Sequence, residues 1–231
     1  MTDFSGNVSS DVSKAKYLES LGVTDFGEFI LGKNTTRILH EDPKLLLFTL
    51  ARYKFVAKMF SDFDNVLEVG CQEGFGAAVV SQNVKRLHGV DFYVPHIESC
   101  NRRIKNEKLT FEAADILTGP IRKNFQGAFA LDVLEHIDQA SEDCFMKNIC
   151  GSICESGVVI LGMPSLESQK YASVASKLGH VNCKTGSEFS QYARRYFNNV
   201  FSFGMNDEVL HTGFFPMSHY LFVVCTHPIL R

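Results

Sequence analysis

The chain has 231 residues, of which 45% are hydrophobic, and its formal net charge is −3. This length favours one large α/β domain over two small ones, and the hydrophobic share is sufficient for a sheet covered on both faces. Nucleic-acid binding depends on many Lys and Arg contacts to phosphate. A slightly acidic chain without a long basic run is therefore not expected to bind nucleic acid.

The seven cysteines are irregularly spaced and include no C-x-x-C pair. Their odd number and irregular spacing argue against a disulfide framework or a zinc knuckle and predict a reducing compartment. No metal-ligand cluster is visible in the sequence, so no metal site is expected. No stretch approaches the roughly 20 apolar residues of a membrane span. The first residues also lack the basic segment and apolar run of a secretory signal. We therefore expect a cytoplasmic protein without a membrane partner.

The first 60 residues are predicted to form a helical extension to a larger domain over residues 61–231. Residues 1–12 are polar and are predicted to be frayed. Residues 13–32 carry apolar positions at helical spacing, interrupted by glycines, which indicates two short helices. Pro43 follows an acidic pair and is typical of a first helical turn, so a helix is predicted over residues 43–60.

From residue 65 onwards, short apolar runs alternate with helical segments. This alternation predicts a doubly wound α/β fold with a mainly parallel sheet covered on both faces. The last two strands have no helical segment between them, so they are predicted to pair as an antiparallel hairpin in a seven-stranded sheet. The predicted strands are 65–70, 86–91, 109–115, 127–132, 157–164, 200–207 and 219–227. The predicted helices between them are 73–82, 93–104, 139–152 and 187–197.

A glycine-rich turn follows the first predicted strand. Gly70, Gly74 and Gly76 are spaced G-x-x-x-G-x-G, which does not match the G-x-G-x-x-G of dinucleotide-binding folds. Glu68 and Glu73 flank the turn. Two carboxylates would repel a pyrophosphate, but they suit a ligand that carries an ammonium or sulfonium group. The turn therefore argues against an NAD-dependent oxidoreductase, which stays a third alternative.

The string VLEVGCQEGFG over residues 66–76 resembles the first motif of the class I S-adenosylmethionine-dependent methyltransferases. It departs from the common form of that motif at Gln72, where the family usually has glycine. The resemblance covers roughly residues 60–165 and implies S-adenosylmethionine as the cofactor. It also implies a cofactor site that includes Glu68, Gly70, Gln72, Gly74 and Gly76.

Acidic residues also end the next three predicted strands, in the order expected of that family. Asp91 is placed to accept hydrogen bonds from both ribose hydroxyls, and Phe92 to pack on the adenine face. By resemblance, Asp115 takes the exocyclic amine of adenine and Ile116 covers the ring. Asp132, in the string DVLEH, faces the transferring methyl group. Such residues can also merely cap the next helix, and a glycine turn can serve packing alone.

Two histidines are candidates for catalytic roles. His180 lies in a Gly-His-Val stretch that resembles a segment near the acceptor pocket of many small-molecule methyltransferases, and His136 follows the fourth strand. Either imidazole can act as a general base, because its ordinary pKa is about 6.5. Each can equally be a histidine without a chemical role. Residues 211–216 form an aromatic loop that either walls the acceptor pocket or closes the sheet edge.

These observations predict methyl transfer to a hydroxyl or amine of a small molecule, such as a sugar, a quinone-like compound or a natural-product intermediate. The helical extension is expected to cover the cofactor as a lid. The alternative is a non-catalytic binding or assembly module of the same fold, which Gln72 favours and the ordered acids disfavour. The sequence leaves the oligomeric state open, a homodimer included. The candidate contacts from the extension are Tyr17, Phe26, Phe29, Arg37, Arg52 and Tyr53.

Overall fold

The computed structural model describes residues 5–22, 28–121 and 124–229, which belong to two compact units. The first unit, residues 1–30, contains helix α1 (Ser5–Gly22). Residues 5–12 are helical rather than frayed, and the described part of 13–32 contains one helix instead of the two predicted. Phe26 lies outside the described residues.

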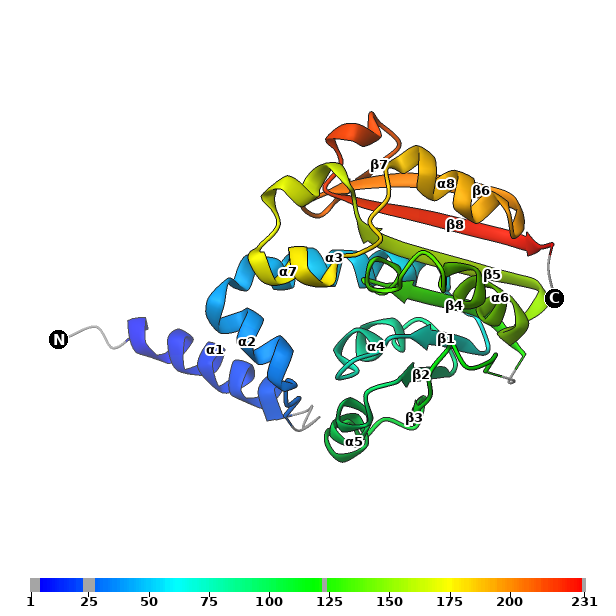
Figure 1. Ribbon diagram of the computed structural model, residues 1–231. Helices are drawn as coiled ribbons and strands as arrows, with labels where there is room; N and C mark the ends of the chain where they lie inside the picture. The colour runs from blue at the N-terminus through cyan, green and yellow to red at the C-terminus, as the bar shows by residue number, and fades with distance from the viewer. Residues whose placement is uncertain (1–4, 23–27, 122–123, 230–231) are drawn as a thin grey trace. The chain divides into compact units, whose positions relative to one another are not determined.

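The second unit, residues 31–231, is built on an eight-stranded sheet of order β3-β2-β1-β4-β5-β8-β6-β7 (Figure 1). The first five of these strands run parallel, and β8, β6 and β7 pair antiparallel. The predicted doubly wound sheet is confirmed, and the short β7 makes an eighth strand. The strands are β1 (Val66–Val69), β2 (Leu87–Asp91), β3 (Leu109–Ala113), β4 (Phe125–Leu131), β5 (Ile153–Pro164), β6 (Phe197–Asn206), β7 (Val209–His211) and β8 (Tyr220–Pro228).

Helices cover both faces of this sheet. On one face, α3 and α4 pack through residues such as Val56 and Val80, and on the other, α6 and α8 pack through Phe145 and Phe189 (Figure 1). The strands β1 and β2 are therefore buried at every position, as parallel strands covered on both faces are expected to be. The helices are α2 (Lys33–Glu41), α3 (Pro43–Met59), α4 (Phe75–Val80), α5 (Val94–Arg103), α6 (Glu142–Ser152), α7 (Val174–Gly179) and α8 (Gly186–Arg194). Short 3-10 helices are η1 (Leu134–His136), η2 (Glu167–Tyr171) and η3 (Phe215–Met217).

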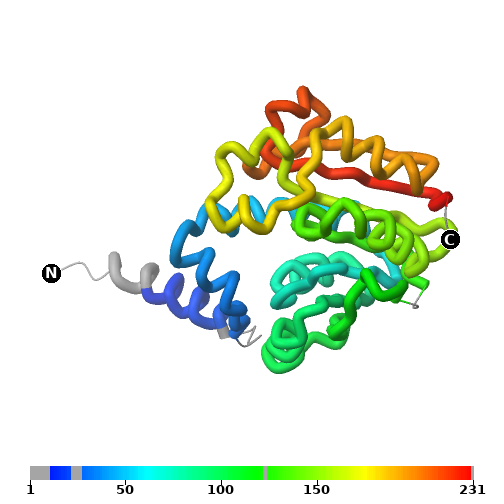
Figure 2. Tube along the Cα trace, viewed as in Figure 1, coloured from blue at the N-terminus to red at the C-terminus, as the bar shows by residue number. Residues whose placement is uncertain are grey.

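Between β5 and α8 the chain makes an excursion from the sheet, which carries η2 and α7 (yellow-green to yellow in Figure 2). Ser165 and Lys184 close it through an isolated bridge, in which Leu166 N donates to the Lys184 carbonyl at 2.9 Å. The excursion therefore begins and ends at the same place, beside the carboxyl end of β5. His180 lies on its returning limb.

The aromatic loop predicted over 211–216 lies between β7, which ends the strand order of the sheet, and β8. His211 belongs to β7, and Phe215 begins η3. A Cβ atom added at Gly186 would lie 2.7 Å from the Phe215 Cβ, so Phe215 packs closely against the start of α8. This loop lines neither of the two clefts described below.

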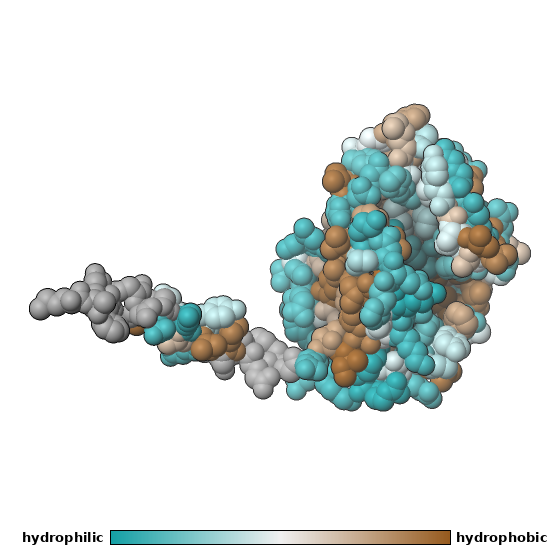
Figure 3. Space-filling view, turned by 90° about the vertical axis from the view of Figure 1, so that its left-hand side faces the viewer, coloured by the Kyte–Doolittle hydropathy of each residue, from teal (hydrophilic) through white to brown (hydrophobic). Residues whose placement is uncertain are grey.

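Some apolar surface remains exposed on the second unit. Figure 3 shows apolar atoms gathered in a band on the left-hand face of Figure 1. The exposed large apolar side chains of α2, α3 and α7 include Leu39, Leu45, Leu47, Val174 and Leu178. Within the described ranges, no helix combines the length and the apolar character needed to cross a bilayer.

Candidate functional site

The carboxyl ends of the parallel strands border a cleft of about 620 Å³, here called the main cleft. This is where ligands bind in open α/β sheets, and the volume suits a nucleoside-sized ligand. Seven of the ten predicted cofactor residues line it, together with His136. The predicted residues along its wall are Gly70, Gln72, Asp91, Phe92, Asp115, Ile116, Asp132 and His136.

A smaller cleft of about 140 Å³ adjoins the glycine turn. It shares Gly70, Gln72 and Asp132 with the main cleft, and Gly76 also lines it. On its other side it is lined by α2 and α3, through residues that include Asn34, Thr35, Ile38, Leu46, Thr49 and Tyr53. The turn is thus open on one side and lies against these helices on the other.

The glycine turn keeps its shape despite the glutamine. Gly70 has φ +77°, and a Cβ atom there would lie 2.4 Å from Val133 Cγ2, so only glycine fits. Gln72 has φ +45°, in the left-handed region that favours glycine. Its backbone N–H donates to Asp91 Oδ2 at 2.9 Å, which helps to hold it there. Gln72 therefore adopts a left-handed backbone conformation that glycine favours.

Asp91 lies at the end of β2, and only 6% of the residue's surface is exposed. Its Oδ1 accepts from Tyr93 N and its Oδ2 from Gln72 N, both at 2.9 Å. Each oxygen retains a further lone pair, so the carboxylate can still accept two hydroxyl donors from a ligand in the main cleft. Phe92 follows with 75% of its surface exposed, available to cover such a ligand.

The ends of β3 and β4 place the other two acids differently. Asp115 is exposed, and its Oδ1 accepts from Leu117 N at 2.9 Å, so it caps the turn as well as lining the main cleft. Asp132, with φ +56°, accepts from Arg52 Nη1 at 3.2 Å and 3.0 Å on its two oxygens. The Arg52 guanidinium also lies 3.9 Å from the centre of the Tyr220 ring. Arg52, predicted as a contact to cofactor, thus pairs with Asp132.

The two glutamates that flank the turn are occupied by the protein itself. Burial, with the nearby Asp91 charge, raises the pKa of Glu68 to about 8, although a hydrogen bond from Tyr53 opposes the shift. Glu73 Oε2 accepts from Asn34 N at 2.8 Å and Thr35 N at 3.5 Å, at the first turn of α2. Neither Glu68 nor Glu73 therefore faces the main cleft as a free carboxylate, as their positions beside the turn had suggested.

Gly74 also lies away from both clefts. It is the residue before α4, with φ +73°, and it packs against Ile104 and Phe111. Of the ten predicted cofactor residues, Glu68 and Gly74 therefore line neither cleft, and Gly76 lines only the smaller one. In the extension, Tyr17 and Phe29 belong to the first unit, and Arg37 is exposed on α2.

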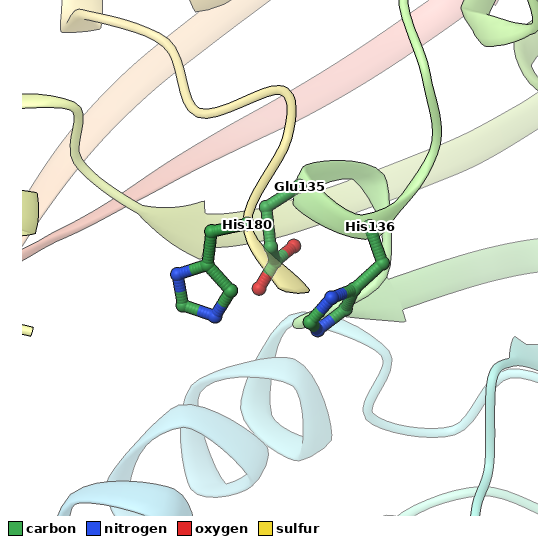
Figure 4. Close-up of side chains that lie close together, drawn as sticks. All are labelled: Glu135, His136 and His180. Atoms are coloured by element: carbon green, nitrogen blue, oxygen red, sulfur yellow. The ribbon is translucent and has the colours of Figure 1, made fainter. Parts of the chain in front are cut away.

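The second unit also brings His136 and His180 together, with ring centres 5.1 Å apart. The carboxylate of Glu135 points between the two rings (Figure 4). One ligand atom from each of these three side chains lies within 4.8 Å of the others. Glu135 is fully buried, and neither carboxylate oxygen has a hydrogen-bond partner. Burial, then the charge of Asp132, raises the pKa of Glu135 well above its ordinary value.

Backbone hydrogen bonds hold the returning limb of the excursion against η1. Val181 N and Asn182 N donate to the Glu135 carbonyl at 2.8 Å and 3.0 Å. His136 Nδ1 lies 2.9 Å from the Gly179 carbonyl, which can only accept, so this nitrogen carries the proton. Residues 179–182 are thereby fixed beside η1, and the two imidazoles are held in place by the backbone.

The proton on His180 is placed by the same reasoning. Its Nδ1 lies 2.8 Å from Gln169 Oε1, while the Gln169 amide donates to the Ser165 carbonyl at 3.3 Å. His180 Nδ1 therefore donates, and both histidines retain a lone pair on Nε2. Burial and the nearby His136 also lower the pKa of His180, which favours its neutral form. The sequence points to both histidines as catalytic candidates, whereas it leaves Glu135 as either a solvated residue or a partner for a nearby cation.

Residues 66–157 match the family described as "Methyltransferase domain". No curated protein matches the chain. Among solved structures, the N-methyltransferase NodS from Bradyrhizobium japonicum WM9 in complex with S-adenosyl-L-homocysteine has a TM-score of 0.57 and 16% identity, over 92% of this chain and 97% of that one. A TehB-like S-adenosylmethionine-dependent methyltransferase from Corynebacterium glutamicum has a TM-score of 0.57 and 14% identity, over 95% and 97%. The methyltransferase domain of bacterial CtHen1 has a TM-score of 0.63 and 16% identity, over 78% and 99%.

The structural likenesses show the fold, and the matched domain covers the glycine turn and the strand-end acids that line the main cleft. These residues fit S-adenosylmethionine. Gly70 lets a ligand approach the backbone of the turn, the buried Asp91 carboxylate has lone pairs left for hydroxyl donors, and Ile116 gives the cleft an apolar wall. Residues 66–157 thus match a methyltransferase-domain family, and the chain shares the fold of S-adenosylmethionine-dependent methyltransferases of known structure.

Proposed function

We propose that this protein is an S-adenosylmethionine-dependent methyltransferase that transfers the methyl group to a hydroxyl or amine of a small molecule bound beside His136 and His180. The observation that carries the proposal is the position of His136. It lines the same cleft as Asp91 and Asp115, and its ring packs against His180. The two imidazoles thus lie next to the predicted cofactor site, where an acceptor must meet the methyl group.

The cofactor supplies an electrophilic methyl group on a sulfonium. The acceptor's oxygen or nitrogen forms the new bond to carbon, the electron pair of the broken C–S bond stays on sulfur, and the acceptor's proton leaves. Because the leaving sulfide is neutral, positioning of the two reactants supplies much of the acceleration. An Nε2 lone pair on His136 or His180 can take the proton or orient the acceptor's hydrogen.

The protein's own residues explain how the cofactor would be held. Asp91, which lines the main cleft, would accept the ribose hydroxyls, while Phe92 and Ile116 on its wall would border the adenine. Asp132, with its charge balanced by Arg52, closes the end of the cleft next to His136. We assign the covering role predicted for the first 60 residues to α2 and α3, because both line the smaller cleft at the glycine turn.

A small acceptor fits the charge of the chain better than a nucleic acid does. The net charge is −3 and no long basic run is present, so few phosphate contacts are available. The non-catalytic alternative rested on Gln72. That argument loses its weight because Gln72 keeps the left-handed backbone that the turn requires.

A labelled methyl-transfer screen tests the proposal. Purified full-length protein is incubated with S-adenosylmethionine carrying a tritiated methyl group and with panels of small hydroxyl and amine acceptors, with small RNA and tRNA as separate arms. Label is expected in a small molecule, with stoichiometric release of S-adenosylhomocysteine. His180→Ala is expected to lower kcat with less effect on the KM for S-adenosylmethionine. Label only in RNA would overturn the proposed acceptor class.

A further inference from the structure

We propose that Glu135, His136 and His180 bind a divalent transition-metal ion at the acceptor end of the main cleft. Two imidazole nitrogens and one carboxylate are a common ligand set for such ions, and three protein ligands leave positions open for water or substrate. The three side chains converge in Figure 4, and their ligand atoms lie within 4.8 Å of one another. Ligand atoms that share an ion at about 2.1 Å lie roughly 3.5 Å apart, so modest side-chain adjustment completes the site.

The first support for this site is the buried carboxylate. Glu135 is fully buried, and both of its oxygens lack a hydrogen-bond partner, although buried carboxylates are normally paired. The guanidinium of Arg52, which acts on Glu135 only at a distance, gives its hydrogen bonds to Asp132. A cation between the carboxylate and the two rings would satisfy the oxygens that the protein leaves unpaired.

The second support is the orientation of the two imidazoles. Each ring donates its Nδ1–H to a protein oxygen, the Gly179 carbonyl for His136 and the Gln169 amide for His180. Metal-bound histidines usually have such a partner on the second nitrogen, because it fixes the tautomer and directs the other lone pair to the metal. The protein's own hydrogen bonds thus leave the Nε2 lone pair of each histidine available to bind a cation.

The ligand set also selects the class of ion. Imidazole nitrogens suit Fe²⁺, Ni²⁺, Cu²⁺ or Zn²⁺, whereas Mg²⁺, Ca²⁺ and Mn²⁺ prefer sites made of oxygen ligands. His136 is exposed and lines the main cleft, so solvent and acceptor can reach the open positions of the ion. No metal-ligand cluster is visible in the sequence, because these ligands come from two separate segments, η1 and the returning limb of the excursion.

The consequence for the reaction rests on the proposed function. An acceptor hydroxyl bound to the cation loses its proton to water more readily, and its oxygen then attacks the methyl carbon while the C–S electron pair stays on sulfur. The site therefore narrows the acceptor class to molecules with a hydroxyl that can bind a metal. The imidazoles then serve as ligands rather than as bases.

Titration of tag-free, EDTA-treated full-length protein with Co²⁺ tests the site, with visible ligand-field absorption and calorimetry as readouts. One Co²⁺ per chain is expected, displaced by Zn²⁺ but not by Mg²⁺. His136→Ala and His180→Ala should each weaken binding at least tenfold, and Glu135→Gln should do the same. His40→Ala removes an exposed histidine on α2, outside the cluster, and should change the affinity less than twofold.

Thermal melting of each variant distinguishes loss of the metal site from loss of the fold. If Glu135→Gln misfolds, the two histidine variants still test the site, because His136 is exposed and His180 is half-buried. Binding that survives both histidine substitutions would overturn the proposal. A near-ultraviolet thiolate-to-cobalt band would do so too, because it would place the ion on free cysteines. Calorimetric titration of the metal-free samples with S-adenosylhomocysteine tests the proposed function separately. If S-adenosylhomocysteine does not bind, methyl transfer is refuted, whereas the result of the Co²⁺ titration still stands.

Discussion

Asp91 is the residue through which the glycine turn and the predicted ribose site meet. Its two oxygens each accept a backbone N–H, from Gln72 and from Tyr93, so the same carboxylate shapes the turn and offers lone pairs to a ligand. A charged hydrogen bond is worth about 1.5–3 kcal/mol. Asp91→Ala should therefore weaken binding of S-adenosylhomocysteine by roughly 10- to 100-fold in calorimetric titration.

The matched control is Asp64→Ala, which removes an aspartate paired with Lys85 at the surface, outside both clefts. Its affinity for S-adenosylhomocysteine should stay within about twofold of wild type. Asp91→Asn should fall between the two, because one of its side-chain atoms becomes a donor that faces a backbone N–H. An Asp91→Ala protein that binds as tightly as wild type would remove Asp91 from the cofactor site.

Glu68 links the same region to the pH dependence of stability. Its pKa is raised from 4.5 to about 8 by burial and by Asp91, so between these values the unfolded chain loses the proton while the folded chain keeps it. Stability from this group is complete below pH 4.5 and is lost as the pH rises towards 8. Glu68→Gln cannot ionise, and it should gain stability relative to wild type by up to about 4 kcal/mol between pH 5 and pH 8.

Urea unfolding at pH 5 and pH 8 measures the free energy of unfolding of wild type and Glu68→Gln. The change between the two pH values is compared between the proteins, so any pH-independent effect of the substitution cancels. The Tyr53 hydroxyl can still donate to the glutamine oxygen, so the packing of Glu68→Gln stays close to that of wild type. A difference in the free energy of unfolding that stays constant from pH 5 to pH 8 would show that Glu68 is already ionised in the folded protein.

At the scale of elements, α2 begins without a capping side chain of its own. The residue before it is Gly32, and the first backbone N–H groups are satisfied by Glu73, 39 positions later in the sequence than Asn34. The usual helix-start signal, a Ser, Thr, Asp or Asn, is absent, which is why α2 was not predicted from the sequence. From the sequence, Glu73 is only a carboxylate that flanks the glycine turn and would suit a cationic ligand, because its partner in space lies 39 positions away and leaves no local signal.

Removal of this cap should loosen α2 specifically. Glu73→Ala leaves the first N–H groups of a nine-residue helix unpaired, at a cost of about 1 kcal/mol, and amide hydrogen exchange in residues 33–41 should rise. Glu188→Ala is the matched control, because Glu188 completes the capping box with Thr185 at the start of α8. That variant should raise exchange in residues 186–194 instead. Equal exchange of residues 33–41 in wild type and Glu73→Ala would contradict the capping role.

At the scale of the whole molecule, the strands and helices with a periodic hydrophobic pattern are predictable from the sequence, whereas contacts between residues far apart in the sequence are not. The strands up to β5 were found because apolar runs of four to eight residues and intervening helical patterns are local signals. β7 has three residues and α7 has six, too few for a period to stand out. His180 lies 45 positions after Glu135 in the sequence, and it meets Glu135 and His136 because the excursion closes through the Ser165–Lys184 bridge.

The division of the chain into two units makes a last prediction. Residues 31–231 contain the whole sheet, and the residues lining both clefts fall between Asn34 and Asp138. A variant that starts at Leu31 should therefore unfold cooperatively and bind S-adenosylhomocysteine within about threefold of the full chain. At a ligand concentration 100 times Kd, it should gain about 2.7 kcal/mol of stability, as the full chain does. Differential scanning calorimetry and isothermal titration measure both quantities. A loss of more than tenfold in affinity would instead assign residues 1–30 a direct part in binding, as the predicted contacts at Tyr17 and Phe29 require.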